Sequence, residues 1–332
     1  MQTFIIRRML SGIVILFVLS VAVFLLLRIV PGDPAIRICQ LNCTKAQIDQ
    51  IHRDLGLDKP YFPVSLDFTD PKVVSFSGDS QYGTYITNLM TGDLGTSNFN
   101  HKPVAPQVID RMPVTLEIMA LTLIFTLVVG IPFGVVSAVF RNSPADLFVR
   151  STSVLGLAIP SFWIATLVLV FPSELWGYAP VIGRKISLFQ DPVGNFKQVA
   201  PAAAVLALGS AAGIMRLTRS SLLEVMRQDY MRTARAKGLR EGSVIIRHGL
   251  KNSMIPVITV LGLQISGLLG GAIIVETIFT LPGLGLFTLQ SLAIKDYDVV
   301  QTMTLYAGVT VVVINLMVDV SYAWLDPRIR YS

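Results

Sequence analysis

Six long apolar segments constrain the fold of this 332-residue chain more strongly than any other feature. Each is long enough for an α-helix to cross the hydrocarbon core of a bilayer, which takes about 20 residues. Charged residues make up only 14% of the chain, against about 25% in soluble domains, which leaves too little polar surface for a soluble globule. We therefore expect an all-α membrane protein with six transmembrane helices, five of them in a core over residues 113–325. The segments are residues 9–30, 113–140, 147–172, 200–223, 253–276 and 302–325.

The first apolar segment resembles a signal peptide in one respect, because Arg7 and Arg8 precede it. However, its apolar run is longer than the core of a typical signal peptide. The Pro-Gly-Asp-Pro sequence at residues 31–34 also lacks a small-residue cleavage pattern. We therefore expect a retained anchor, with residues 1–30 forming a short tail and the first helix.

Basic residues in one connecting segment predict the orientation of the helices. The segment 216–251 contains far more Lys and Arg than Asp and Glu, and such loops stay in the cytoplasm. Alternation of six helices then places both termini, including the tail 326–332, in the cytoplasm. Residues 31–112, 173–199 and 277–301 are expected outside. The basic residues are Arg216, Arg219, Arg227, Arg232, Arg235, Lys237, Arg240, Arg247 and Lys251, and the acidic ones are Glu224, Asp229 and Glu241.

The outward segment of residues 31–112 is long enough to form a small extracytoplasmic subdomain. A capping-box pattern at residues 44–47 predicts the start of a short amphipathic helix, and Gly56 is a suitable residue to end it. Residues 61–83 contain several Pro and Gly residues and predict an irregular surface loop.

Cys39 and Cys43 form a C-x-x-x-C pair in the same outward segment. An oxidising compartment would permit a disulfide between them, and two free thiols are the alternative. A metal site that includes His52 is a further hypothesis. These spacings match no standard ligand pattern, so we expect no metal site.

Three acidic residues lie within or at the ends of spans, where a charge is costly and often functional. They are Glu117, Glu276 and Asp319. Because Glu276 and Asp319 lie toward the ends of their helices, we expect solvation or pairing with a loop cation and no substrate site.

Small residues and prolines predict local features of the spans. The glycine-containing stretches 209–213 and 267–271 predict close packing between helices. Pro160 predicts a bend in the third span, since proline lacks an N–H and clashes with the preceding helical turn.

The basic loop over residues 224–252 has features of a docking element. Gly238 permits a sharp turn between two short helices, and small residues at 233, 234 and 236 allow another protein surface to approach closely. The alternative is that its cations only orient the protein in the membrane.

Residues 232–238, Arg-Thr-Ala-Arg-Ala-Lys-Gly, resemble the EAA loop of binding-protein-dependent ATP-binding-cassette permeases. The form is similar to that of the first permease in dipeptide, oligopeptide and nickel importers, and the similarity covers essentially the whole chain. The glutamate that names the loop is absent, as is common in this group. The further motifs are residues 7–8 (Arg-Arg), 31–34 (Pro-Gly-Asp-Pro), 55–60 (Leu-Gly-Leu-Asp-Lys-Pro), 92–95 (Gly-Asp-Leu-Gly), 113–117 (Pro-Val-Thr-Leu-Glu), 276–279 (Glu-Thr-Ile-Phe), 282–285 (Pro-Gly-Leu-Gly), 296–297 (Asp-Tyr) and 326–328 (Asp-Pro-Arg).

The resemblance implies a permease subunit in the cytoplasmic membrane. Its expected partners are a second homologous permease, two ABC ATPase subunits and an extracytoplasmic substrate-binding protein. The chain contains no Gly-Lys dipeptide and so no phosphate-binding loop of the Walker type, which implies that ATP and Mg are bound by the partner subunits and that this chain is not an enzyme. The expected ATPase-coupling residues are Tyr230, Arg232, Thr233, Ala234, Arg235, Ala236, Lys237, Gly238 and Leu239.

The outward loop that begins at Phe279 is a candidate for substrate delivery, because Pro282, Gly283 and Gly285 break the helix there. The alternative is a re-entrant turn that only satisfies its own backbone. By resemblance, the expected cargo is di- or oligopeptides, and nickel, glutathione or sugars are alternatives.

Other classes of function are less consistent with the sequence. A secondary transporter or channel would need ion-coordinating groups in its core, and no internal repeat is evident. An intramembrane enzyme would need a motif such as H-E-x-x-H or G-x-S-x-G, and neither occurs. The basic residues lie between apolar segments, so we expect no nucleic-acid partner.

Overall fold

The computed structural model describes residues 2–29, 35–36, 44–66, 74–76, 79–177 and 183–325. The chain forms two compact units. The core unit contains Arg111–Leu286 and the chain from Thr310 onward, and the N-terminal unit combines Ile6–Asp110 with Phe287–Val309. The predicted disulfide between Cys39 and Cys43 lies outside the described residues.

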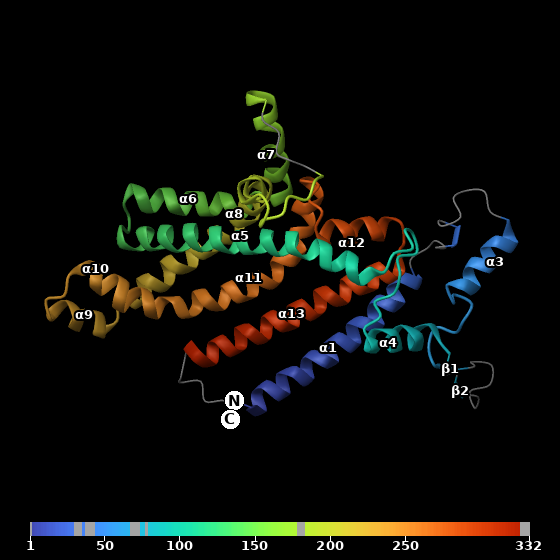
Figure 1. Ribbon diagram of the computed structural model, residues 1–332. Coiled ribbons are helices and arrows are strands. Elements are labelled where there is room, and N and C mark those ends of the chain that lie inside the picture. Colours follow the sequence, from blue (N-terminus) through green and yellow to red (C-terminus); the bar gives the residue numbers. More distant parts are fainter. Residues whose placement is uncertain are drawn as a thin grey trace. The chain divides into compact units, whose positions relative to one another are not determined.

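The core unit is built around one long helix. Helix α8 (Pro192–Val225) packs against α6 (Pro144–Ala158) and α11 (Lys251–Ile278). Helix α5 (Val104–Val139) contributes its part after residue 111 to this unit (Figure 1). Small side chains let the neighbours of α8 approach closely, and five of its alanines are buried: Ala202, Ala203, Ala207, Ala211 and Ala212.

Five of the six predicted spans are confirmed as single long apolar helices in the described part of the chain. These are α1 (Gln2–Ile29), α5, α8, α11 and α13 (Tyr297–Leu325). Both α5 and α8 begin several residues before the predicted segments, because a helix that crosses a bilayer can continue into the polar region beyond it.

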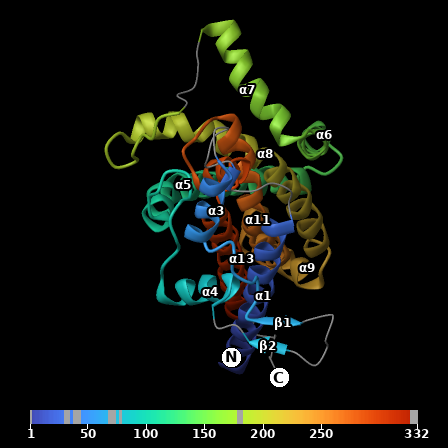
Figure 2. The same cartoon turned by 90° about the vertical axis from the view of Figure 1, so that its right-hand side faces the viewer.

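The predicted span over residues 147–172 is not a single continuous helix in the structure. Helices α6 and α7 (Ser161–Trp176) occupy it and meet at an angle of 98° (Figure 1 and Figure 2). Pro160 causes the break, as predicted for a bend, because it cannot donate a helical hydrogen bond and forces Ile159 into an extended conformation with ψ 125°. The pair is one broken span or a re-entrant element.

The N-terminal unit is built on an aromatic cluster. Phe24 of α1 contacts the rings of Phe62 and Tyr82 edge to face, at centroid distances of 5.6 and 5.1 Å. Tyr82 belongs to α4 (Gln81–Thr91), and its hydroxyl lies 2.9 Å from the Ser20 hydroxyl. Such contacts add to the burial of the rings. They fix α4 against α1.

The region after α1 matches the sequence prediction in one part and differs in another. Helix α3 (Lys45–Asp54) begins as predicted, since the backbone N–H of Thr44 donates to the Gln47 side chain at 2.9 Å, and Gly56 follows it with φ +62°. The predicted irregular loop over 61–83 is wrong in part. It contains the antiparallel strands β1 (Val64–Leu66) and β2 (Val74–Phe76), paired Val64 to Phe76, and the first residues of α4.

A buried carboxylate joins three helices of the core unit. Asp146, in the first turn of α6, is completely buried. Its oxygens accept hydrogen bonds from Arg219 of α8 at 2.8 and 3.0 Å and from the Ser137 hydroxyl of α5 at 2.5 Å. The bidentate geometry compensates the cost of removing both charges from water.

A second buried carboxylate, Glu276 at the end of α11, organises the turn that follows it. It is completely buried and accepts hydrogen bonds from the Thr115 hydroxyl of α5 at 2.6 Å and from the Leu286 backbone N–H at 2.9 Å. The Leu286 N–H belongs to the first turn of α12 (Leu284–Ala293), where helical amides lack internal partners. The Leu284 N–H donates to the Thr115 hydroxyl, which completes the network.

The expectation that Glu276 is solvated or paired with a loop cation is therefore wrong. Its partners are a hydroxyl and a helix N-terminus, which also favours a negative group. Glu117 accepts a hydrogen bond from the Asn195 side chain at 2.7 Å. The side chain of Asp319 lies outside the described part.

We predict that Asp146→Asn destabilises the chain by about 3 kcal/mol, because it leaves the Arg219 cation without its carboxylate in a largely buried site. Thermal unfolding of the purified chain in detergent measures the loss. Arg150→Gln is the matched control, since Arg150 approaches the same carboxylate at 3.5 Å from an exposed position. A loss for Asp146→Asn no larger than that of the control would contradict the prediction.

We also predict that Gly285→Ala destabilises the chain by about 1–3 kcal/mol through overpacking. A Cβ at Gly285 would lie 2.6 Å from the Ile273 Cα and 2.9 Å from the Glu276 carboxylate, and the backbone atom cannot move aside easily. The control is Gly270→Ala, where a Cβ would meet nothing within 4 Å. The same unfolding measurement compares them, and equal stability of the two variants would refute this account.

Candidate functional site

The loop between α8 and α11 is the element that the sequence predicts to dock a partner. It contains α9 (Asp229–Ala236), a single turn α10 (Glu241–Ser243) and a π-helix, η1 (Val244–Leu250), that runs directly into α11 (Figure 1). Gly238 lies between α9 and α10 with φ +76°, a conformation that glycine adopts without strain. The predicted turn between two short helices is confirmed.

One face of α9 is packed into the loop itself. Met231 and Val244 are completely buried and Ala234 is 7% exposed. These three residues form a hydrophobic cluster with Val225 and Met226 at the end of α8. The loop is therefore a packed structure anchored to α8 and η1.

The opposite face of α9 is exposed and carries most of the predicted coupling residues. Tyr230 on α9 and Leu239, three residues after its end, keep 41% and 43% of their surface exposed. Ala234 lies on the packed face of α9 instead, and its role in coupling stays a prediction. The other exposed predicted residues are Arg232, Thr233, Ala236, Lys237 and Gly238.

Polar contacts hold the exposed face in place. The Arg235 guanidinium binds both oxygens of Glu241 across the Gly238 turn, at 2.9–3.2 Å. The Asn252 amide of α11 donates to the Tyr230 hydroxyl at 2.9 Å. Each exposed pair adds little stability alone, but both limit the positions that the turn can take.

The outward loop predicted to deliver substrate is mostly buried. Phe279 is 1% exposed and belongs to the main hydrophobic cluster of the core unit. Gly283 and Gly285 are buried beside the Glu276 carboxylate, and Pro282 is partly exposed. These positions are explained by packing of the turn, and substrate delivery stays a prediction.

The core unit also contains a cavity of about 370 Å³ between α6, α7, α8 and α11. Gln264 of α11 lines it, and its amide N–H lies 3.5 Å from the Ser210 carbonyl oxygen while its own Oε1 has no hydrogen-bond partner among the described residues. Gln264 was not among the residues singled out from the sequence, although an amide within an apolar span is a visible signal. Three glycines that were predicted to allow close packing also line the cavity, namely Gly209, Gly267 and Gly271.

The predicted close packing is found at only some of these glycines. A Cβ at Gly271 would lie 3.0 Å from the Leu206 side chain, whereas one at Gly267 would meet nothing within 4 Å. Gly267 therefore leaves space on the cavity side of α11 instead of admitting a neighbouring helix.

Metal-binding chemistry was considered for His52 in the sequence analysis. Within the residues whose placement is given, no group of three or more His, Cys, Asp or Glu side chains could hold a metal ion.

Two family models match successive parts of the chain. The model described as "Binding-prot-dependent transport system membrane comp, N-term" matches residues 1–119, and "Binding-protein-dependent transport system inner membrane component" matches residues 130–331. The oligopeptide transport system permease protein AppB of Bacillus subtilis is 38% identical over 333 aligned positions, with all of both chains covered. The glutathione transport system permease protein GsiC of Pectobacterium atrosepticum is 37% identical over 335, again with full coverage.

Solved structures support the fold. A chain of the MetNI methionine ABC transporter in an inward-facing conformation superimposes with a TM-score of 0.54 at 19% identity, covering 66% of this chain and 96% of that one. A chain of an amino acid ABC transporter gives a TM-score of 0.50 at 16% identity, covering 66% and 94%. The family models, which cover most of the sequence, and the full-length relatives show that the chain belongs to the family of inner membrane components of binding-protein-dependent transport systems.

Proposed function

We propose that this chain is the permease subunit of an ATP-driven importer and that it carries di- or oligopeptides across the cytoplasmic membrane. The observation that carries the proposal is the ordered loop over residues 224–252, whose exposed face contains Tyr230 and Leu239 while its other face is packed against α8. A loop that only oriented the protein in the membrane would need its cations but not this packed structure.

The packing of the loop supports a mechanical role. A force on the exposed face of α9 reaches α8 through the Met231 cluster and reaches α11 through η1, which continues directly into it. Both helices line the cavity that contains Gln264. Closure of ATPase subunits on ATP would therefore tilt these helices and open the pathway outward, and hydrolysis would return them. We assign the wall of this cavity to the pathway.

The proposed complex contains a second homologous permease, two ABC ATPase subunits that bind ATP and Mg, and an extracytoplasmic substrate-binding protein. The family description supports the binding protein, since these systems are named for it. The excess of basic residues in the loop supports a cytoplasmic position for it and for both termini. The outward subdomain would then follow α1.

Peptide cargo is supported by the names of relatives that align over their full length, one an oligopeptide and one a glutathione permease. Glutathione is itself a tripeptide, so both names indicate peptide-like molecules. Nickel and sugars are the alternative cargoes.

We predict that Ala236→Trp reduces co-purification of the ATPase subunits at least tenfold, because it adds bulk to the exposed face of α9 without entering the loop core. Met90→Trp is the control, since Met90 is 84% exposed on α4, away from this loop in sequence. Thermal unfolding confirms that both variants fold. Full retention of the ATPase subunits by Ala236→Trp would contradict the docking role.

For the cargo, we predict that proteoliposomes containing the complete complex and its binding protein accumulate a labelled tripeptide only when ATP is supplied. Omission of ATP and omission of the binding protein are the controls. Uptake of nickel with no uptake of any peptide in a mixed library would refute the peptide assignment while leaving the importer assignment intact.

A further inference from the structure

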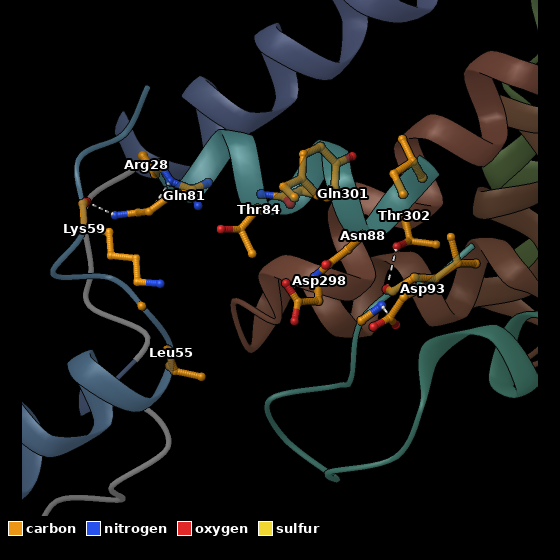
Figure 3. A pocket seen from close by; sticks show the side chains of 15 residues that line it. Arg28, Leu55, Lys59, Gln81, Thr84, Asn88, Asp93, Asp298, Gln301 and Thr302 are labelled. Carbon is orange, nitrogen blue, oxygen red and sulfur yellow. Dashed lines mark hydrogen bonds between the residues drawn. The ribbon is translucent and has the colours of Figure 1, made fainter. Parts of the chain in front are cut away.

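The N-terminal unit contains a partly enclosed cavity of about 200 Å³ that the proposed coupling mechanism does not use. It lies between α4, the end of α1, the loop after α4 and the start of α13 (Figure 3). Three motifs noted in the sequence meet around it: residues 55–60 and 92–95 contribute lining residues, and 296–297 immediately precede the lining residue Asp298. The cavity therefore brings together three sequence motifs to which the proposed coupling mechanism assigns no role.

One end of the cavity is negative. Asp298 lines it, and in the described part of the chain its carboxylate has neither a hydrogen bond nor an ion pair. Asp93 lies nearby on the loop after α4, and Figure 3 shows Asn88 between the two acidic residues. Gly95 has φ +80°, and a Cβ there would lie 3.1 Å from the Asp298 carboxylate. The glycine thus keeps this carboxylate unobstructed.

Neutral polar groups in the same cavity also lack partners. Gln301 is only 2% exposed, yet its side-chain amide has no hydrogen bond to any residue whose placement is given. The Tyr85 hydroxyl is buried without a partner as well. Burial raises the pKa of the Tyr85 phenol, so the group remains an O–H donor. The buried Tyr85 hydroxyl without a partner is costly, and a hydrogen bond to a molecule in the cavity would offset that cost.

The other end of the cavity is positive. Arg28 donates from Nε to the Gln81 side chain at 2.8 Å and from Nη1 to the Phe24 carbonyl at 3.1 Å, and its guanidinium lies 3.4 Å from the Phe24 ring centroid. These contacts hold the group rigidly and leave Nη2 without a hydrogen bond in the part of the chain that is described. Lys59 is neutralised by Asp79 at 2.8 Å, so it adds no net charge.

From this arrangement we propose that the cavity binds a small zwitterion, an amino acid or dipeptide. Its ammonium group would lie against Asp298 with the Gln301 amide, and its carboxylate would lie against Arg28. Opposite charges in one cavity without an ion pair between them favour a ligand that carries both charges. The physiological role of this site rests on the proposed peptide cargo. Binding of the zwitterion to the cavity does not itself depend on transport.

Calorimetry on the complex of the two permeases and the two ATPase subunits, without the substrate-binding protein, tests the proposal with glycylglycine as the probe. We expect saturable binding that weakens at least tenfold for N-acetylglycylglycine, which lacks the ammonium group, and for glycylglycinamide, which lacks the carboxylate. Each analogue removes one charge-assisted contact. No measurable binding of glycylglycine at millimolar concentration, or equal binding of the acetylated analogue, would overturn the proposal.

Asp298→Asn separates binding from folding, since this side chain has no partner whose loss would unfold the chain. We expect its melting temperature to be unchanged or higher and its affinity for glycylglycine to fall at least tenfold. Lys59→Gln is the matched control on the same cavity and should change the affinity less than twofold. Equal effects of the two substitutions would refute the charge assignment. Because this assay needs no ATP, a complex that binds glycylglycine but transports no peptide would count against the proposed cargo alone.

Discussion

Burial inside the packed helices removes polar groups from water, and this constraint determines how the core unit is built. The two carboxylates that are buried among its described residues both meet it with hydrogen bonds. Asp146 takes its hydrogen bonds from α5 and α8, and Glu276 takes its own from α5 and the first turn of α12. Each carboxylate therefore fixes the contact between the helices that supply its hydrogen bonds. Apolar contacts between the same helices are not directional and would not specify one arrangement. Directional polar contacts supply that specificity.

Much of the fold could be predicted from the sequence because apolar length alone identifies a spanning helix. The capped start of α3 and the turn at Gly238 were also visible, since both depend on residues close together in the chain. The partners of Glu276 could not be predicted in this way. Thr115 lies 161 positions away, and only the packed core brings the two together.

The candidate site shows the same division between local and long-range information. The residue types over 232–238 predicted a docking element. They did not predict which face of α9 is exposed. That orientation depends on the contact between Met231 and Val244, which belong to different elements. Ala234, for example, is packed on the buried face of α9. A small residue can admit a partner surface or fill a tight core, and composition does not distinguish the two.

The π-helix η1 has a consequence for how the loop can move. A π-helix contains an extra residue relative to an α-helix of the same number of turns, because its hydrogen bonds join residues five apart, and such segments are frequent at functional sites. Each residue of an α-helix turns the chain by about 100°. Relocation of the extra residue within Val244–Leu250 would rotate the loop about the axis of α11 without unfolding either element. Such a relocation would make the junction a torsional joint, which would let the loop swivel about α11.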